Sequence, residues 1–218
     1  MISISLAGCA EKEYQIHDVS VIKEYYEKIN NTTDWKKSPS FDERCAIMQI
    51  PDDMLNNIDT ETLFDAVINY PFFSYINAYT NIQDGVDIML ENFNGIQELA
   101  KRSDSPEMIL QKYIDEKVLN SDEISELSSQ EVVNSVFKLH NMEVILAQDF
   151  VTKNLDEDKQ EQLKQAVYEK YLAKNKLKAY DGFVLTFFKV CKNENIVFLD
   201  FEQDYYSMNI NGISVKIE

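Results

Sequence analysis

The sequence predicts a mainly α-helical protein, an irregular bundle of six to eight helices with a small C-terminal β-hairpin or sheet element. Apolar residues recur every three or four positions through most of residues 18–178, which is the spacing of one helix face. After Asp181-Gly182 the composition changes: residues 183–190 and 196–201 are rich in β-branched and aromatic residues. Ile210-Asn211-Gly212-Ile213 is the usual pattern of a two-residue hairpin turn. Residues 183–191 could also extend a buried helix, because short apolar runs fit both structures.

Residues 60–101 contain the densest apolar and aromatic stretch, so we expect the other helices to pack onto them. Pro71 divides this stretch into two amphipathic helices. Gly85 lies inside the second helix, and Asn92-Phe93-Asn94-Gly95 is a weak helical segment that predicts a kink. The predicted buried residues are Phe64, Val67, Phe72, Ile76, Val86, Met89, Phe93, Val136 and Leu163.

Several helix starts are marked by residues that cap N-termini. The spacing of Ser40 and Glu43, and of Ser128 and Glu131, matches the capping box. Asp59 is expected to cap the central stretch, and Ser105 to cap a helix with Pro106 in its first turn. A last long helix should begin near residue 156 and end in a lysine-rich turn that suits the negative end of the helix dipole.

The charge of the chain limits its partners. It has 38 acidic and 21 basic residues, a formal net charge of −17. Such a chain repels phosphate backbones and anionic lipid surfaces, so nucleic-acid binding is disfavoured. The acidic residues are spread along the sequence, which is typical of a solvated surface; the alternative is an acidic surface that mimics nucleic acid or binds a basic partner.

The N-terminus carries the most specific motif. Leu6-Ala7-Gly8-Cys9 follows a short apolar run and precedes a polar segment. It resembles the lipobox of bacterial lipoproteins, and this resemblance implies cleavage before Cys9, lipid on the Cys9 thiol and a protein anchored on the outer face of a cell membrane. We therefore expect residues 1–9 to be a signal-peptide remnant, residues 10–17 a tether, and residues 18–218 a single helical domain with its β element from about residue 183.

The motif departs from the lipoprotein class in one respect. Only eight residues precede Cys9 and none is basic, whereas a signal peptide has a basic start and a longer apolar run. We expect the true start codon to lie upstream, with Met1 inside the signal. The alternative is a short apolar strand or tail with a buried cysteine, in a cytoplasmic protein.

The body of the chain carries a second, weaker resemblance. Residues 45–99, with their Ile-Pro, Asn-Tyr-Pro and Asn-Phe-Asn-Gly-Ile-Gln-Glu-Leu sequences, resemble uncharacterised secreted helical proteins of Gram-positive bacteria. This resemblance covers about a quarter of the chain and implies no activity.

Residues with the spacing of a catalytic or metal site are scarce. The sequence has no His-x-x-x-His, Gly-x-Ser-x-Gly, glycine-rich phosphate loop or calcium loop, so we predict neither a metal nor a cofactor. His140 lies on the inner face of a helix and is the one candidate general base, with a core-edge histidine as the alternative. Cys45 and Cys191 are candidates for a disulfide if the protein is extracytoplasmic, and are buried thiols otherwise. The acidic groups that could hold a cation are 52–53, 156–158 and 200/202/204, although such residues usually cap helices or face water.

Three functions remain open. The first is a lipid-anchored extracytoplasmic helical module that binds a partner protein or surface ligand. The second is an enzyme whose site, assembled by the fold, contains His140 and carboxylates, and it requires a concave pocket around His140. The third is a cytosolic acidic inhibitor or immunity-type protein that binds a basic partner. The sequence does not indicate an oligomeric state.

Overall fold

The structure is a computed structural model that describes residues 14–32, 37, 40–192, 206–210 and 213–217. This part of the chain is mainly helical, which confirms the predicted class. The α-helices are α1 (Ser20–Asn30), α3 (Phe41–Ile47), α4 (Asp52–Asn57), α5 (Thr60–Ile68), α6 (Ile82–Asn92), α7 (Asn94–Leu99), α8 (Ser105–Asp115), α9 (Ser121–Glu126), α10 (Ser129–Leu146), α11 (Asp149–Thr152), α12 (Glu157–Lys174) and α13 (Thr186–Val190). Two 3₁₀ helices, η1 (Phe73–Ala78) and η2 (Lys178–Tyr180), interrupt this series.

The described residues form twelve α-helices, more than the six to eight predicted. Part of the excess comes from breaks within apolar stretches. Phe93 is extended (φ −122°, ψ 113°) between α6 and α7, at the predicted kink. Gln148 is extended (φ −73°, ψ 151°) between α10 and α11. The spacing of apolar residues does not reveal such breaks, because the same three- or four-residue spacing continues across them in the sequence.

The C-terminal part differs from the prediction. Residues 183–190, at the predicted start of the β element, instead contain the short helix α13, whose apolar side chains are buried. This agrees with the alternative of a buried helix for residues 183–191. The strands are β1 (Tyr206–Ile210) and β2 (Ile213–Ile217), which pair antiparallel with Ile210 opposite Ile213. Residues 196–201, also predicted as strand-like, lie outside the described part of the chain.

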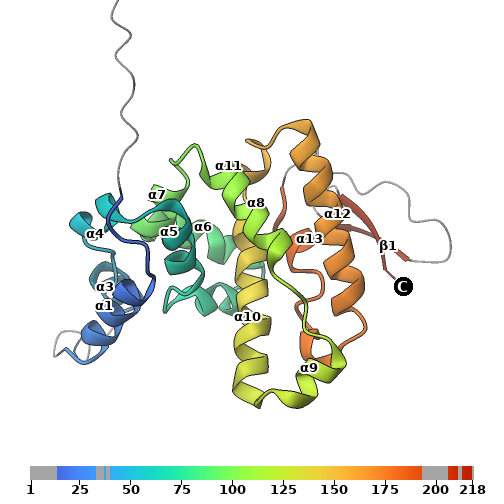
Figure 1. The fold of residues 1–218 in the computed structure, drawn as a ribbon, viewed down its shortest axis with the longest axis horizontal. Helices are drawn as coiled ribbons and strands as arrows, with labels where there is room; N and C mark the ends of the chain where they lie inside the picture. The colour runs from blue at the N-terminus through green and yellow to red at the C-terminus, as the bar shows by residue number, and fades with distance from the viewer. Residues whose placement is uncertain (1–13, 33–36, 38–39, 193–205, 211–212, 218) are drawn as a thin grey trace, which may run out of the picture.

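Helix α10 runs through the middle of the molecule (Figure 1). It packs against α5, α8, α11, α13 and η2. From Leu139 to Leu146 all but one of its residues are buried, so its C-terminal half is enclosed on every side. The sequence predicts that the other helices pack around residues 60–101. In the structure the helices of this stretch lie on one side of α10, and α12 and α13 lie on the other side (Figure 1).

The predicted core and most predicted caps are correct. All nine residues predicted to be buried are buried, and the buried apolar side chains between Ile22 and Cys191, apart from Leu119, form one connected cluster. Both capping boxes form, and the Asp59 carboxylate accepts a hydrogen bond from the Thr62 amide (2.6 Å). Ser105 is not a cap: it is the first residue of α8, after Asp104, and its side chain is buried. No helix among the described residues is long and apolar enough to cross a membrane.

The end of the predicted tether packs on the domain. The amides of Gln15 and Ile16 donate to the Asn57 carbonyl (2.8 and 2.9 Å), and the Asp59 amide donates to the Ile16 carbonyl (3.1 Å). The ring of Tyr14 lies 4.9 Å from the Arg102 guanidinium carbon. Residues 14–17 therefore belong to the folded domain, which begins earlier than predicted, and residues 10–13 lie outside the described part.

Candidate functional site

The candidate site is an apolar pocket where α6 crosses η1. Gly85 sets the distance between these two helices, because a Cβ atom at this position would lie 2.7 Å from the Ile76 Cα and 2.8 Å from the Ile76 carbonyl oxygen. Contacts that short to backbone atoms cannot be relieved by rotating a side chain. A glycine inside a helix, which normally costs stability, is explained here by the close approach of the two backbones.

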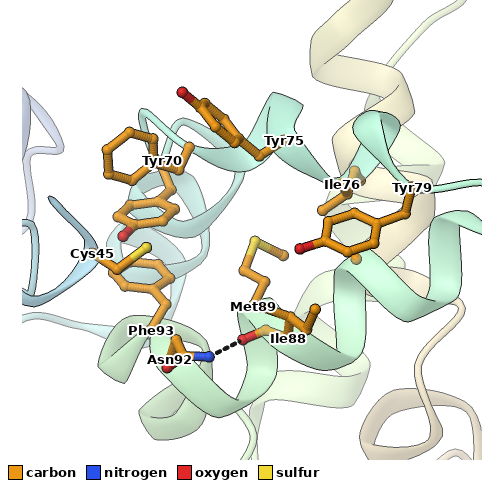
Figure 2. Close-up of a pocket in the computed structure, with 11 residues that line it drawn as sticks. Cys45, Tyr70, Tyr75, Ile76, Tyr79, Ile88, Met89, Asn92 and Phe93 are labelled. Atoms are coloured by element: carbon orange, nitrogen blue, oxygen red, sulfur yellow. Dashed lines mark hydrogen bonds between the residues drawn. The ribbon is translucent and has the colours of Figure 1, made fainter. Parts of the chain in front are cut away.

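Five of the eleven residues that line the pocket are aromatic (Figure 2). Its lining consists of Cys45, Tyr70, Phe72, Tyr75, Ile76, Tyr79, Gly85, Ile88, Met89, Asn92 and Phe93. The cavity measures about 20 Å³, enough for one methyl-sized or water-sized group. Met89 lies in the middle of this space, between Tyr70 and Phe93 on one side and Ile76 and Tyr79 on the other (Figure 2). Because methionine is unbranched and adapts its shape easily, its movement would enlarge the cavity.

One wall of the pocket is a rigid stack of rings. Tyr70 stacks on Phe93 with centroids 3.8 Å apart and planes 12° apart, and Phe72 meets Tyr70 edge to face at 5.7 Å. Burial raises the pKa of the Tyr70 hydroxyl well above its usual range, and the neighbouring Cys45 adds to this shift. Tyr70 is therefore neutral at physiological pH and contributes a ring rather than a charge.

Two amide side chains hold this wall in place. The Gln49 Nε2 atom donates to the Cys45 and Asn92 carbonyls (2.7 and 2.8 Å), and its Oε1 atom accepts from the Asn94 amide (2.8 Å). The Asn94 side chain accepts from the Ile50 amide (3.0 Å) and donates to the Ile50 carbonyl (2.7 Å). These bonds tie α3 to the break between α6 and α7, and so position Cys45 beside Phe93. Sequence reasoning found the break but not the pairing, since Gln49 and Asn94 are 45 residues apart.

The rim of the pocket is exposed and apolar. Four large apolar side chains are exposed among the described residues: Val21, Tyr75, Tyr79 and Val133. Tyr75 (43% exposed) and Tyr79 (37%) both line the pocket. The pocket thus combines a partly enclosed apolar floor with two accessible aromatic rings, which is the composition of a site that receives an apolar side chain.

His140 lies away from this pocket, buried in α10. Its Nδ1 atom is 2.8 Å from the Thr186 Oγ1 atom, which itself donates to the Phe183 carbonyl (2.9 Å). The Thr186 hydroxyl therefore accepts from Nδ1–H, and Nε2 is the unprotonated nitrogen. Burial, together with the positive charges of Lys174 and Lys189, lowers the pKa of His140 from 6.5 to about 4. The side chain is 1% exposed and packs on the Phe183 ring, so it does not face the concave pocket that an enzyme at His140 requires.

Beside His140 lies a buried ion pair that the sequence did not predict. The Lys174 Nζ atom is 2.6 and 2.7 Å from the two carboxylate oxygens of Glu143, and both side chains are almost fully buried. The Tyr113 hydroxyl donates to the same carboxylate (2.9 Å). Lys174 belongs to the lysine-rich turn predicted to suit the negative end of the helix dipole, and its side chain is buried in the core.

The remaining predicted site residues are spread over the molecule. Cys45 and Cys191 are both buried thiols rather than a disulfide, Cys45 in the pocket wall and Cys191 after α13. Cys9, the predicted lipidation site, lies outside the described residues. Asp156 caps α12 by accepting from the Lys159 amide (2.8 Å), and residues 52–53 lie in the first turn of α4. The acidic residues at 200, 202 and 204 lie outside the described part, within which no three His, Cys, Asp or Glu side chains gather around one point.

Comparison with known proteins gives no relative: no family model, no curated protein and no solved structure matches the chain.

Proposed function

We propose that this protein is a lipid-anchored, extracytoplasmic helical module that binds a partner protein through the pocket between α6 and η1. The observation that carries the binding proposal is the position of Tyr75 and Tyr79, because half of the exposed large apolar side chains among the described residues surround one partly enclosed cavity. Most of the lining residues are aromatic or aliphatic and none is charged, so the chemistry of the pocket favours recognition over catalysis.

The charge around the pocket indicates the partner's chemistry. Helix α6 contains three acidic residues and no basic residue. Asp84 and Glu91 lie on the same face of α6 as Ile88, which lines the pocket. A partner segment with an apolar side chain between basic residues would fill the cavity and face these carboxylates. With the net charge of −17, such a segment is also attracted over longer distances.

A short peptide tests the binding site. Acetyl-Gly-Lys-Leu-Lys-Gly-amide should bind with a Kd on the order of 1 mM, since it buries a single leucine and its two lysines face Asp84 and Glu91. Replacing its leucine by glycine should weaken binding by at least about tenfold. In the protein, Tyr75→Ala and Tyr79→Ala should each weaken binding by about tenfold, because exposed aromatic residues at the rim of a pocket supply much of the contact area.

The matched control for the tyrosine variants is Val133→Ala, which removes an exposed apolar side chain away from the pocket. Affinities are measured by titration calorimetry in 0.15 M salt, which screens attraction between distant charges. Equal effects of Tyr79→Ala and Val133→Ala, or equal affinity for the leucine and glycine peptides, would refute binding in this pocket.

The anchor is tested separately, because it depends on Leu6-Ala7-Gly8-Cys9 and not on the pocket. When the gene is expressed with its upstream codons, the protein should fractionate with membranes and incorporate labelled palmitate, and Cys9→Ser should abolish both results. A soluble protein that Cys9→Ser leaves unchanged would contradict the anchor. It would favour the cytosolic acidic inhibitor, which could use the same pocket.

A further inference from the structure

A second hollow lies on the other face of α6. Gln83, Asp87 and Leu90 follow one another at helical spacing on this face, whereas Gly85, Met89 and Asn92 face the aromatic pocket. The hollow has a volume of about 270 Å³ and is closed by the junction of α10 with α11 and by the end of α13. The other lining residues are Ala147, Gln148, Asp149, Phe150, Val190 and Lys192.

The floor of the hollow is a pair of buried glutamines. Gln83 and Gln148 are 2% and 5% exposed, and the Gln83 Nε2 atom donates to the Gln148 Oε1 atom (3.1 Å). The Gln148 Nε2 atom donates to the Val144 carbonyl (2.7 Å) and, at 3.4 Å, to the Gln83 Oε1 atom. Burying amide groups is unfavourable unless their hydrogen bonds are made, and here each side-chain nitrogen donates two hydrogen bonds and each side-chain oxygen accepts one.

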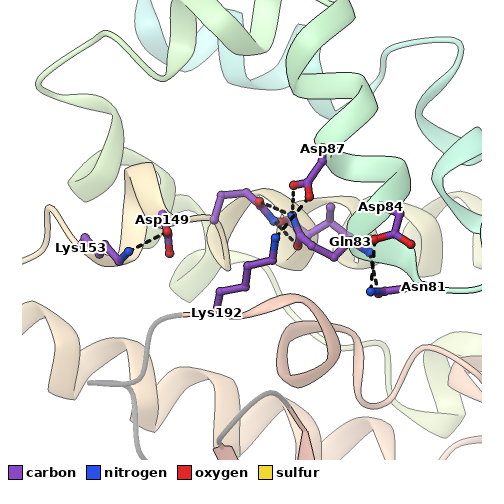
Figure 3. A network of polar contacts seen from close by, with 9 residues as sticks. Asn81, Gln83, Asp84, Asp87, Asp149, Lys153 and Lys192 are labelled. Carbon is purple, nitrogen blue, oxygen red and sulfur yellow. Dashed lines mark hydrogen bonds and ion pairs between the residues drawn. The ribbon is translucent and has the colours of Figure 1, made fainter.

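This floor orients a carboxylate. The Gln83 Nε2 atom also donates to the Asp87 Oδ1 atom (2.6 Å), so the Asp87 carboxylate is held by a group that cannot move without breaking the buried pair. The Asp87 Oδ2 atom accepts from the Lys192 Nζ atom at 3.3 Å (Figure 3). On the opposite wall the Asp149 carboxylate accepts from the Lys153 Nζ atom (2.7 Å). The hollow is thus lined by two carboxylates on different helices and by the apolar groups of Leu90, Phe150 and Val190.

We propose that this hollow is a binding site for a primary ammonium group on a short apolar stem, and that Lys192 occupies it in the free protein as a tethered competitor. The oriented Asp87 carboxylate and Asp149 would receive the ammonium, and the apolar walls would receive the stem. The volume is more than enough for a chain of about four carbons and is below that of sites for drug-sized ligands. A free alkylamine and a lysine side chain of another protein share this chemistry.

Lys192 can be displaced because its ion pair with Asp87 is about half exposed on both sides. Such pairs contribute between zero and about 1 kcal/mol. A competitor that weak lowers the apparent affinity of an incoming ammonium by no more than about fivefold. The site lies across α6 from the pocket of the proposed function, so either proposal can fail without the other.

The test uses n-butylammonium chloride in 0.15 M salt, with n-butanol as its uncharged counterpart and N-acetyl-lysine amide as the side-chain form. Binding is followed by the NMR signals of the Gln83 and Gln148 side-chain amides. Butylammonium should shift both signals saturably, and butanol should not. If N-acetyl-lysine amide also causes saturable shifts, the hollow binds lysine side chains of proteins as well as free amines. If it causes none, the hollow binds free amines only.

Variants distinguish binding in this hollow from the general attraction between cations and a chain with a net charge of −17. Lys192→Met should tighten butylammonium binding by up to about fivefold, whereas Lys176→Met, with the same change in charge at an exposed position, should leave it unchanged. Asp87→Asn should abolish saturable binding, whereas Asp181→Asn at an exposed turn should not. Asp149→Asn should weaken binding too, which keeps the proposal testable if Asp87→Asn fails to fold.

The proposal is overturned if neither the wild type nor Lys192→Met shows saturable shifts, if butanol acts like butylammonium, or if Asp181→Asn weakens binding as much as Asp87→Asn.

Discussion

Lys174→Met is expected to lower the free energy of unfolding by about 3–5 kcal/mol. The substitution keeps most of the volume of the side chain but removes the positive charge that lies between the two oxygens of Glu143. Glu143 would then be a buried carboxylate whose remaining hydrogen bond comes from Tyr113. An uncompensated charge in a nearly dry environment costs far more than the loss of one exposed ion pair. Urea denaturation monitored by circular dichroism measures the change.

The matched control for Lys174→Met lies two residues further along the chain. Lys176→Met removes the same charge from an exposed side chain and should change stability by less than about 0.5 kcal/mol. A double variant, Glu143→Leu with Lys174→Met, should recover roughly half of the loss or more, because it removes both charges together and leaves only the Tyr113 hydroxyl without its acceptor. Equal effects of Lys174→Met and Lys176→Met would show that Lys174 is not buried beside Glu143.

The second large effect is a loss of stability in acid that depends on His140. Burial and the charges of Lys174 and Lys189 lower its pKa to about 4 in the folded protein, against an ordinary value of 6.5. Between these values the unfolded chain binds more protons than the folded chain, so the contribution of His140 to stability is complete above pH 6.5 and is lost as the pH falls toward 4. At pH 4.5 this loss should reach roughly 2 kcal/mol.

Comparison with His140→Leu isolates this contribution from the carboxylates that also titrate in acid. Leucine cannot be protonated and suits a site that packs on the Phe183 ring. Between pH 7 and pH 4.5 the wild type should therefore lose roughly 2 kcal/mol more than the variant. Parallel curves of unfolding free energy against pH would mean that His140 is not held neutral by its surroundings.

Local rules account for much of the fold. The boxes formed by Ser40 with Glu43 and by Ser128 with Glu131 were predictable because capping depends on residues three positions apart. The apolar face of α6 was predictable for the same reason: helical spacing alone places Val86 and Met89 inside. The break at Phe93 was predicted only as a kink, because the bonds that hold the chain extended there come from distant residues, such as those of Asn94 to Ile50.

The candidate sites were less accessible to sequence reasoning. From the sequence, Gly85 is only a residue that disfavours the helix. The reason for a glycine at this position is the close approach of the η1 backbone, which the sequence does not show. The His140 hypothesis rested on residue type; three-dimensional packing decides its state, through Thr186 and two lysines more than 30 residues away. Lys174 and Glu143 are 31 residues apart, and nothing in their local spacing shows that they meet.

The pocket between α6 and η1 is tested most directly at Met89, whose side chain lies inside it (Figure 2). The protein is labelled at its methionine methyl groups, the Met89 signal is assigned with Met89→Leu, and the acetyl-Gly-Lys-Leu-Lys-Gly-amide peptide is titrated in 0.15 M salt. We expect the Met89 methyl signal to shift saturably, because the entering leucine displaces this side chain, while the signal of Met142, buried in α10, stays in place. A Met89 signal that does not move at peptide concentrations well above 1 mM, or that moves only together with Met142, would contradict binding at this pocket.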